Sequence, residues 1–429
     1  MTKIENNTEA LKRVEQELKK CVKCGACRAH CPAFAAFQRE PAAARGKIAL
    51  AQHLLKGDIA LDDSTYAAMS KCLLCGSCVG KCSNEVPTDE IVIVAREALA
   101  QQRGLTTFHQ AVGRVIRNRT LMNFGAGAAR FFGPVFFRKV PETSGLRSRF
   151  PLPFIGNKRH IPELAKKPFR DRHPEIITGE LCKPRVVFFV GCITNFVYTE
   201  VGEAALALFR HLGCTVIVPK EQQCCGLPGM SGGDLVTFRE LAEKNLAALE
   251  KHKADYIMTA CATCGGALHK FYPAIIGKKH PELAPRIRAI AEKTVDASQL
   301  LQKLGLNPEM TGSGEVLHIT YHDPCHLRTR TIIRQPRELL RGTPGVTLTE
   351  MDGADKCCGL GGTFNVYHYE TSMQINASKS AAIVKTGAAA VVTGCPGCMM
   401  QLADGLKQHG AQTRVLHTLE VLARQLGHN

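Results

Sequence analysis

Apolar runs of strand length alternate with amphipathic stretches through the second half of the chain. The run 185–190 is almost wholly apolar, as in strands buried on both faces, and shorter strands are expected at 214–218 and 256–260. Apolar residues with helical spacing occupy 197–212 and 235–251. Strands that alternate with helices in this way predict a parallel sheet covered by helices on both faces.

The same order of elements recurs further along the chain. Strands are expected at 317–321, 346–350 and 389–393, and each copy closes on a similar helix, at 297–305 and at 418–427. The recurrence predicts two α/β domains of one kind, placed at 183–310 and 311–429.

Residues 1–100 have a helical pattern instead. A helix is expected at 42–56, and Asp62 or Asp63 can cap a second helix because aspartate accepts hydrogen bonds from free backbone N–H groups. The chain is therefore predicted to be an α+β multidomain protein. A helical domain at 1–100 and a connecting segment at 101–182 precede the two repeated α/β domains.

The spacing of the cysteines indicates the chemistry of the chain as well as its fold. Eighteen of the 20 cysteines form two kinds of ordered array. The first kind has x2-x2-x3 spacing and occurs twice, as Cys21, Cys24, Cys27 and Cys31 and again as Cys72, Cys75, Cys78 and Cys82. The second kind combines a single cysteine, a Cys-Cys-Gly turn and a CxxC; it comprises Cys192, Cys224, Cys225, Cys261 and Cys264, then Cys325, Cys357, Cys358, Cys395 and Cys398.

Each cysteine group of the second kind follows the end of an expected strand. The carboxyl ends of parallel strands meet at one edge of an open α/β sheet, which is where such sheets build their sites. Three loops from one edge should therefore bring five thiolates together in each repeat. The adjacent pairs Cys224–Cys225 and Cys357–Cys358 are the candidates for any catalytic role.

These thiols could form disulfides, zinc sites or iron–sulfur clusters. A disulfide framework suits short secreted chains, and this chain of 429 residues lacks an apolar signal segment at its start. Zinc takes four ligands, which fits neither the x2-x2-x3 runs nor the adjacent cysteines. The x2-x2-x3 spacing is that of bacterial ferredoxins and predicts two [4Fe–4S] clusters. The five-cysteine arrays predict one or two further iron–sulfur clusters, with zinc left open there.

Histidines and two further cysteines lie close to these arrays. His322 and His326 flank Cys325, and His269 follows Cys264 by five positions. These histidines could replace a cysteine ligand or relay protons, although packing beside a polar loop is the simpler interpretation. Cys214 opens a strand and is expected to be a buried apolar residue. Cys182 has no assigned role.

Positive charge is concentrated in the connecting segment. The chain has a net charge of +17, and residues 101–180 hold 15 Lys/Arg against 5 Asp/Glu. Nine of the 18 Phe lie there as well: Phe108, Phe124, Phe131, Phe132, Phe136, Phe137, Phe150, Phe154 and Phe169. The segment is either a packed linker or a docking surface for a membrane or a partner. Nucleic acid is not expected, because no nucleic-acid motif accompanies the charge.

Other sequence patterns bear on the cellular location of the chain and on the cofactors it can hold. No run of about 20 apolar residues is present, and abundant reduced thiols fit the cytoplasm, with a peripheral position at the inner face of the cell membrane left open. No GxGxxG, Walker A or Gly-x-Ser-x-Gly motif appears. A flavin or nicotinamide is therefore expected on a separate polypeptide.

With these motifs the chain resembles the iron–sulfur subunits of glycolate oxidase and related D-lactate dehydrogenases. It is also similar to one of the subunits of anaerobic glycerol-3-phosphate dehydrogenase and to the cysteine-rich subunits of heterodisulfide reductase. The resemblance covers nearly the whole chain: a dicluster ferredoxin domain followed by two cysteine-rich CCG domains.

The resemblance implies a ligand set for each cluster. One cubane would be held by Cys21, Cys24, Cys27 and Cys82, and the other by Cys72, Cys75, Cys78 and Cys31. Each CCG array would bind a noncubane cluster through its five cysteines, although smaller clusters or zinc occur at such sites in similar proteins.

The resemblance also implies two classes of function. In one, the chain is an electron-transfer subunit of an oxidoreductase: an FAD-containing partner oxidises a 2-hydroxy acid such as glycolate or D-lactate, and electrons pass through the clusters to quinone or another carrier. In the other, a CCG cluster itself reduces a disulfide or a quinone, as in heterodisulfide reductase.

Overall fold

The computed structural model describes residues 8–140, 145–149, 159–306, 316–425 and 427. Phe150, Phe154, the predicted boundary at 310–311 and the N-terminal five residues lie outside the described residues. The chain forms two compact units. The first unit comprises Met1–Arg117, Gly226–Glu240 and Gly359–Asn376, and the second comprises Asn118–Cys225, Leu241–Cys358 and Ala377–Asn429.

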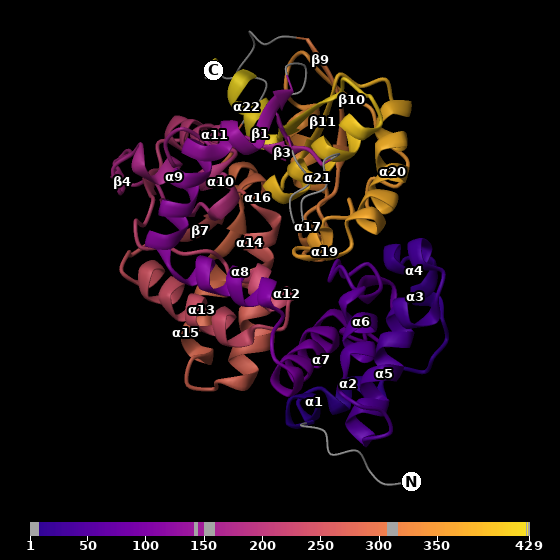
Figure 1. The fold of residues 1–429 in the computed structure, drawn as a ribbon. Helices are drawn as coiled ribbons and strands as arrows, with labels where there is room; N and C mark the ends of the chain where they lie inside the picture. The colour runs from indigo at the N-terminus through magenta and orange to yellow at the C-terminus, as the bar shows by residue number, and fades with distance from the viewer. Residues whose placement is uncertain (1–7, 141–144, 150–158, 307–315, 426, 428–429) are drawn as a thin grey trace. The chain divides into compact units, whose positions relative to one another are not determined.

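The first unit is helical, as the pattern at its start predicts. Its central helix α7 is buried along most of its length and packs against α1, α5 and α6 (Figure 1). Asp62 caps α6 by accepting a 2.8 Å hydrogen bond from the Thr65 amide, as expected of one of the two candidate caps. The N-terminal helices are α1 (Glu9–Lys12), α2 (Glu15–Lys19), α3 (Ala26–Ala29), α4 (Pro32–Phe37), α5 (Ala44–Lys56), α6 (Asp63–Ser70), α7 (Thr88–Arg103) and α8 (Thr107–Arg117).

Two segments from the CCG repeats belong to this first unit. They carry the short helices α12 (Leu227–Ser231) and α19 (Phe364–Tyr367), each of which follows a Cys-Cys-Gly turn. The buried guanidinium of Arg96 on α7 donates a 2.7 Å hydrogen bond to the Ser231 carbonyl. The sequence pattern had given no sign that these segments pack with the N-terminal helices.

The second unit holds two separate parallel sheets, one for each repeat. The first has the order β4-β6-β5-β7-β8, where β4 (Ile176–Ile177) is an antiparallel edge strand. The remaining strands of this sheet are β5 (Arg185–Phe189), β6 (Thr215–Ile217), β7 (Tyr256–Thr259) and β8 (Thr294–Asp296). The second sheet has the order β10-β9-β11-β12, from β9 (Leu317–His322), β10 (Val346–Leu348), β11 (Ala390–Thr393) and β12 (Arg414–His417).

These strands and their helices match the alternating pattern of the sequence. The fold class is confirmed: a helical N-terminal region precedes two α/β repeats with parallel sheets. The helices of the first repeat are α10 (Cys192–Phe196), α11 (Thr199–His211), α13 (Leu235–Glu250), α14 (Ala262–Gly266), a π-helix (Ala267–Gly277), α15 (Ala284–Lys293) and α16 (Ala297–Lys303). Those of the second are α17 (Cys325–Arg328), α18 (Arg334–Arg341), α20 (Tyr369–Lys385), α21 (Pro396–Gln408) and α22 (Thr418–Gln425).

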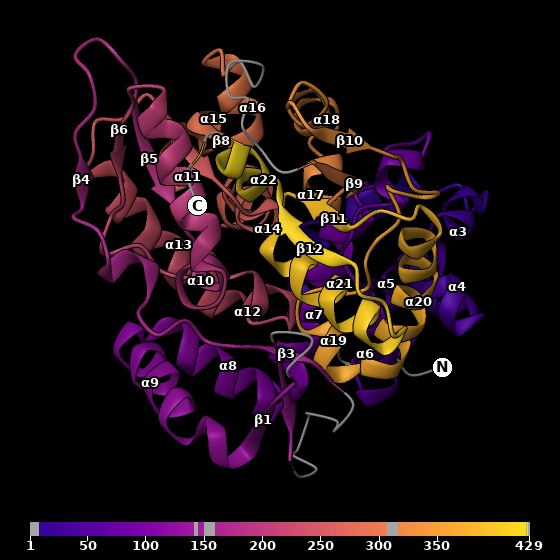
Figure 2. The ribbon, with the colours of Figure 1, turned by 90° about the horizontal axis from the view of Figure 1, so that it is seen from above.

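One hydrophobic cluster contains residues of both repeats, beside a second cluster formed by the second repeat alone. Helices α11 and α16 of the first repeat pack against α18 and α22 of the second (Figure 2). The core cluster accordingly mixes Phe188 and Leu208 of the first repeat with Leu339, Met399 and Leu419 of the second. Because both repeats bury their apolar faces together, the edges that carry the cysteine loops are held in a fixed relationship.

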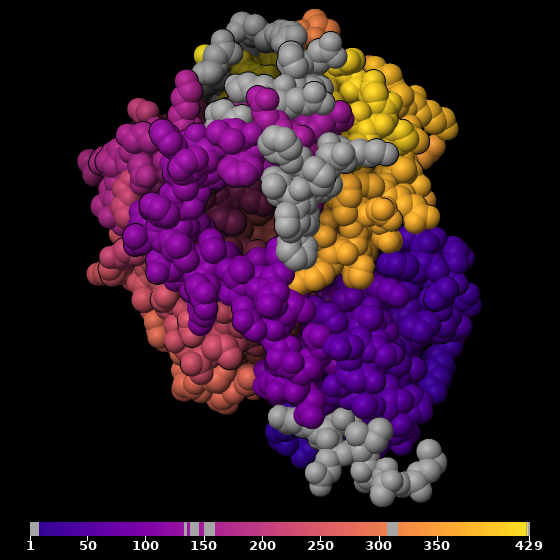
Figure 3. Space-filling view, viewed as in Figure 1, coloured from indigo at the N-terminus to yellow at the C-terminus, as the bar shows by residue number. Residues whose placement is uncertain are grey.

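The described residues of the basic segment include helices and short strands. Beyond α8 it forms helix α9 (Arg119–Phe136) and a small antiparallel sheet of β1 (Phe137–Val140), β2 (Gly145–Ser148) and β3 (Ile161–Pro162). Atoms of α9 lie uncovered on the face shown in Figure 3. Among the described residues, no helix is both long enough and apolar enough to cross a membrane.

Candidate metal centres

The two N-terminal cysteine runs adopt matching loops. Gly25 and Gly76, one position after the second cysteine of each run, have φ of 87° and 65°. The residues one position before that cysteine, Lys23 and Leu74, also have positive φ, of 58° and 54°. This left-handed backbone, which glycine adopts without strain, curls each run so that its thiols face one point.

Each of two cavities collects thiols from both runs. One cavity is lined by Cys31 together with Cys72, Cys75 and Cys78. The other is lined by Cys21, Cys24, Cys27 and Cys82, with Cys78 at its wall. In each case the fourth cysteine of one run lies with the first three of the other. Four thiols around one cavity fit a [4Fe–4S] cubane.

Burial makes these thiols poor acids in the absence of a metal. It is the main cause that raises the pKa of Cys31 to about 11 and that raises the pKa of Cys27. Burial also raises the pKa of Cys78, and the neighbouring thiols Cys75 and Cys72 add to the effect. Because a metal binds the thiolate form, loading these sites must release protons.

Two buried cations lie beside the cysteines of the first cavity. Lys47 is 1% exposed, lines that cavity and donates a 3.3 Å hydrogen bond to the Pro41 carbonyl. Arg96 is 4% exposed and donates a 2.7 Å hydrogen bond to the carbonyl of Cys72. Asp89 also lines this cavity, and its single carboxylate offsets only part of the positive charge of Lys47 and Arg96.

The five cysteines of the first CCG repeat come together beyond their strands. Cys192 begins α10 after β5, and its sulfur lies 3.9 Å from that of Cys224 in the loop after β6. Cys261 caps α14 after β7, and Cys264 on that helix makes hydrogen bonds with Cys225 and Cys261 that raise its pKa. The predicted convergence of three loops is thus seen.

Glycine is required where the first loop passes this cluster. Gly191 precedes Cys192 and has φ 74° and ψ 166°. A Cβ atom at this position would lie 2.7 Å from the sulfur of Cys264. Side chains other than hydrogen are therefore excluded by both the backbone conformation and the sulfur.

Buried polar side chains hold the backbone of the Cys-Cys pair. Asn245 donates a 3.0 Å hydrogen bond to the carbonyl of Cys224, and the Tyr272 hydroxyl donates one of 3.2 Å to the carbonyl of Cys225. Asn245 is fully buried and also accepts a 2.7 Å bond from the Gln223 amide. Side chains of α13 and the π-helix therefore hold the backbone of Cys224 and Cys225 in place.

The second CCG repeat has the same arrangement. The sulfurs of Cys325 and Cys357 are 4.0 Å apart, and those of Cys358 and Cys398 are 3.6 Å apart. Hydrogen bonds from the Cys261 thiol, which has the larger effect, and from the Cys398 thiol hold the pKa of Cys395 well below its usual value. Cys395, in the second repeat, thus interacts directly with a cysteine of the first.

The two CCG sites therefore adjoin. The amide of Ala262 donates a 3.3 Å hydrogen bond to the carbonyl of Gly394, which brings the CxxC loops edge to edge. Sulfur-to-sulfur interactions then continue from the first repeat into the second. We call the following run the sulfur array: Cys225, Cys264, Cys261, Cys395, Cys398, Cys358 and Cys357.

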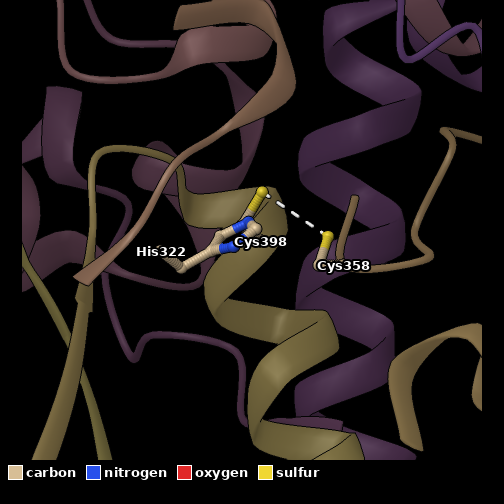
Figure 4. A group of neighbouring side chains, drawn as sticks. All are labelled: His322, Cys358 and Cys398. Carbon is tan, nitrogen blue, oxygen red and sulfur yellow. Dashed lines mark hydrogen bonds between the residues drawn. The ribbon is translucent and has the colours of Figure 1, made fainter. Parts of the chain in front are cut away.

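One histidine lies inside the second site. The ring of His322, at the end of β9, lies with the sulfurs of Cys358 and Cys398, and the three ligand atoms are within 4.8 Å of one another (Figure 4). Burial lowers the pKa of His322, and the nearby ammonium of Lys379 adds to this. Lys379 is itself 3% exposed, and burial lowers its pKa to about 8.

The other residues singled out in the sequence lie elsewhere. His326 packs edge-on to Phe271 at 5.7 Å, and His269 is exposed on the π-helix, where partial desolvation lowers its pKa. Cys214 is fully buried in the hydrophobic core, as predicted. Cys182 is exposed, with φ 68°.

The buried cations Lys47, Arg96 and Lys379 were not predicted from the sequence. A signal for two of them was present: Arg96 interrupts the apolar run of α7, and Lys47 lies on the apolar face of α5. A lone charge among core positions needs a buried partner, and that reasoning could have found them.

Comparisons with known proteins agree with this geometry. Residues 17–86 match the family of 4Fe-4S dicluster domains, and residues 186–269 and 319–403 match the cysteine-rich domain family named CCG. The dicluster domain carries two [4Fe–4S] clusters, as the cysteine spacing predicts, and the CCG domains indicate further iron–sulfur clusters.

Three relatives are informative. The chain is 30% identical over 431 residues to the "Probable glycolate oxidase iron-sulfur subunit" of Bacillus subtilis, covering 96% of this chain and 95% of that protein. It is 31% identical over 240 residues to "Lactate utilization protein A" of an Exiguobacterium species, covering 56% of this chain and 97% of that protein. It is 34% identical over 240 residues to one of the subunits of the CoM/CoB fumarate reductase of Methanothermobacter marburgensis, covering 56% of this chain and 46% of that protein.

Proposed function

The chain belongs to the family of iron–sulfur subunits that includes the glycolate oxidase and lactate utilization proteins, and we propose that it carries electrons from a flavoprotein to quinone or another carrier. The flavoprotein partner would hold FAD and oxidise glycolate or D-lactate. This chain would supply two cubanes and the clusters of its two CCG domains.

The cavities that their cysteines line support a crossed ligand set for the two cubanes. One would be held by Cys72, Cys75, Cys78 and Cys31, and the other by Cys21, Cys24, Cys27 and Cys82. The clusters, when bound, accept and release single electrons. The protein positions them, and Lys47 and Arg96 place positive charge beside one of them.

The sulfur array is the observation that carries the proposal. Ten cysteines could have formed two isolated sites, but Cys261 and Cys395 bring the two CCG sets into contact. A structural metal needs no such neighbour, whereas electron transfer is favoured between centres that adjoin. Burial of Cys225, Cys358 and Cys398 keeps water from the sulfur array.

A reconstituted complex tests the relay. The full chain would be purified anaerobically with an FAD-linked oxidase encoded near its gene, and glycolate or D-lactate would be added under rapid mixing. We expect the iron–sulfur absorbance to bleach after flavin reduction and to return when a soluble quinone is added. Clusters that stay oxidised while the flavin is reduced would contradict the relay.

Contact with a membrane is the finer part of the proposal. On α9, Phe124, Phe131, Phe132 and Phe136 are 72%, 80%, 53% and 43% exposed, which leaves an apolar helix face uncovered within a strongly basic segment. A helix of this kind lies in the surface of an anionic bilayer. That position would bring the chain to a membrane quinone.

A reductase is the second candidate. The relative from the CoM/CoB fumarate reductase is similar over about half of this chain, and His322 and Lys379 give the second site an imidazole and an ammonium beside Cys358. The isolated, chemically reduced chain would then reduce a disulfide or quinone by itself, and Cys358→Ala would abolish this activity. Under the relay, the isolated chain shows no disulfide reduction, and Cys358→Ala blocks only flow from hydroxy acid to quinone.

A further inference from the structure

The second CCG site contains a donor that is not a cysteine. His322 is fully buried, and its ring lies with the sulfurs of Cys358 and Cys398 (Figure 4). These three side chains come from the end of β9, the Cys-Cys-Gly turn and α21, so three separate elements bring them together. Imidazole nitrogen and thiolate sulfur are both ligands for iron and zinc.

The first CCG site has no such donor at the corresponding position. In the parallel ladders, Phe189 pairs with Thr259, and His322 pairs with Thr393. Each of these threonines lies two positions before the first cysteine of a CxxC motif. Phe189 and His322 are therefore equivalent, and the repeats differ in that the second offers a nitrogen where the first offers a phenyl ring.

The ring nitrogens of His322 lack ordinary partners. Among the residues that the structure describes, neither Nδ1 nor Nε2 has a hydrogen bond of ordinary geometry, and the ring interacts with the sulfur of Cys358. A buried polar group without a well-aligned partner is costly, so native proteins rarely keep one without a function or an unseen ligand. A core position would be better filled by an apolar residue, as Phe189 does in the first repeat.

We propose that His322 ligates an iron of the cluster in the second CCG site through a ring nitrogen, beside Cys358 and Cys398. The first site then has sulfur ligands alone, and the second has a mixed sulfur and nitrogen set. This inference rests on the proposal that the second array holds an iron–sulfur cluster. The imidazole is added to the five thiolates and replaces none of them, so the second site differs from the first by one neutral nitrogen ligand.

The test uses the full chain, purified anaerobically and reconstituted with ferrous iron and sulfide. Pulsed EPR on reduced protein with ¹⁴N- or ¹⁵N-labelled histidine should show hyperfine coupling to a coordinated imidazole nitrogen. His322→Phe, which copies the first repeat, should remove this coupling and shift the potential of that cluster. His318→Phe, the same change four residues earlier on β9, should leave both unchanged, since the His318 ring bonds to Thr349 instead.

Three results would overturn the inference. They are a wild-type chain without imidazole nitrogen coupling, a coupling that persists in His322→Phe, and zinc rather than iron at this site by elemental analysis. Labelling of the wild-type chain does not depend on whether the variant folds. Failure of electron flow from hydroxy acid to quinone, with the nitrogen coupling present, would contradict the relay but not the ligand.

Discussion

The hydroxyl of Thr263, in the CxxC loop of the first CCG repeat, lies 3.5 Å from the sulfur of Cys395 in the CxxC loop of the second. The two loops belong to different sheets, and they meet because the repeats bury their helices in one core. A core shared in this way fixes the distance between the two metal sites more firmly than a flexible linker could.

This contact predicts that one cysteine affects both CCG sites. Cys261→Ser should change the EPR signals of the clusters in both repeats, because Cys261 interacts with Cys264 on one side and Cys395 on the other. Cys192→Ser is the matched control: it lies at the end of the first set, against Cys224, and should change the first site only. An unaltered second-site signal in Cys261→Ser would show that the sites are independent.

A second prediction concerns the crossed cubanes. Cys31→Ser should perturb the cluster held by Cys72, Cys75 and Cys78, because Cys31 lines their cavity. Cys82→Ser should perturb the other cluster, and the exposed Cys182→Ser should change neither. Iron content and EPR after each change would check this. If Cys31→Ser altered only the cluster of its own run, the crossed assignment would be wrong.

Much of this architecture follows from local pattern. The strand 185–190, the repeat of strand and helix and the cap at Asp62 depend on nearby residues, so the sequence predicts them. Cysteine spacing likewise predicts which thiols meet, because strand ends in a parallel sheet share an edge.

Long-range packing could not be predicted from the sequence in the same way. The segments 226–240 and 359–376 join the N-terminal helices through contacts such as that of Arg96 with Ser231, residues 135 positions apart. The meeting of Cys261 with Cys395 also depends on how two sheets pack, and no periodicity encodes that. Helix α9 was not predicted, because its segment was interpreted from charge and Phe content and not from helical spacing.

The third prediction uses the buried cation beside one cubane. Lys47→Met keeps the length of the side chain and removes its charge. The reduced cluster is the more negative form, so loss of a neighbouring positive charge should lower the potential of the cluster held by Cys72, Cys75 and Cys78. Redox titration followed by EPR would measure this. Lys56→Met, on the exposed face of the same helix α5, should leave the potential unchanged, and equal shifts in both variants would contradict the role of burial.

The fourth prediction is a pH dependence of stability. His109 is 3% exposed and bonds to Thr106 at 2.9 Å, and burial lowers its pKa from 6.5 to about 4. Between pH 6.5 and 4 the unfolded chain therefore binds more protons at this residue than the folded chain. The contribution of His109 to the free energy of unfolding is therefore fully present above pH 6.5. It decreases as the pH falls from 6.5 to 4, by at most about 1.4 kcal/mol per pH unit.

Urea midpoints at pH 7 and pH 5 would measure this dependence on the cluster-loaded chain. His109→Gln should lower stability at pH 7 and flatten the decrease toward pH 5. His30→Gln, at an exposed histidine of the same unit, serves as the control because it should keep the wild-type slope. An unchanged slope in His109→Gln would assign the acid sensitivity to other groups, such as the clusters themselves.

The last prediction concerns the exposed face of α9. Phe124, Phe131 and Phe132 should enter the surface of a bilayer, so changing Phe131 and Phe132 to Ser should weaken binding to vesicles that contain anionic lipid. Burial of one Phe contributes about 1.5–3 kcal/mol, so the loss should be at least about tenfold in affinity. Basic residues of the segment should make wild-type binding weaker at high salt.

Sedimentation with vesicles of anionic and of neutral lipid, at low and high salt, would measure this. Leu181→Ser is the control, since Leu181 is 95% exposed but lies outside α9. Equal binding of the double variant and the wild type would contradict a lipid-facing helix. If vesicles never bind the chain while the double variant loses its flavoprotein partner in a pull-down, α9 is a subunit interface instead, because the same apolar face would then be covered by protein.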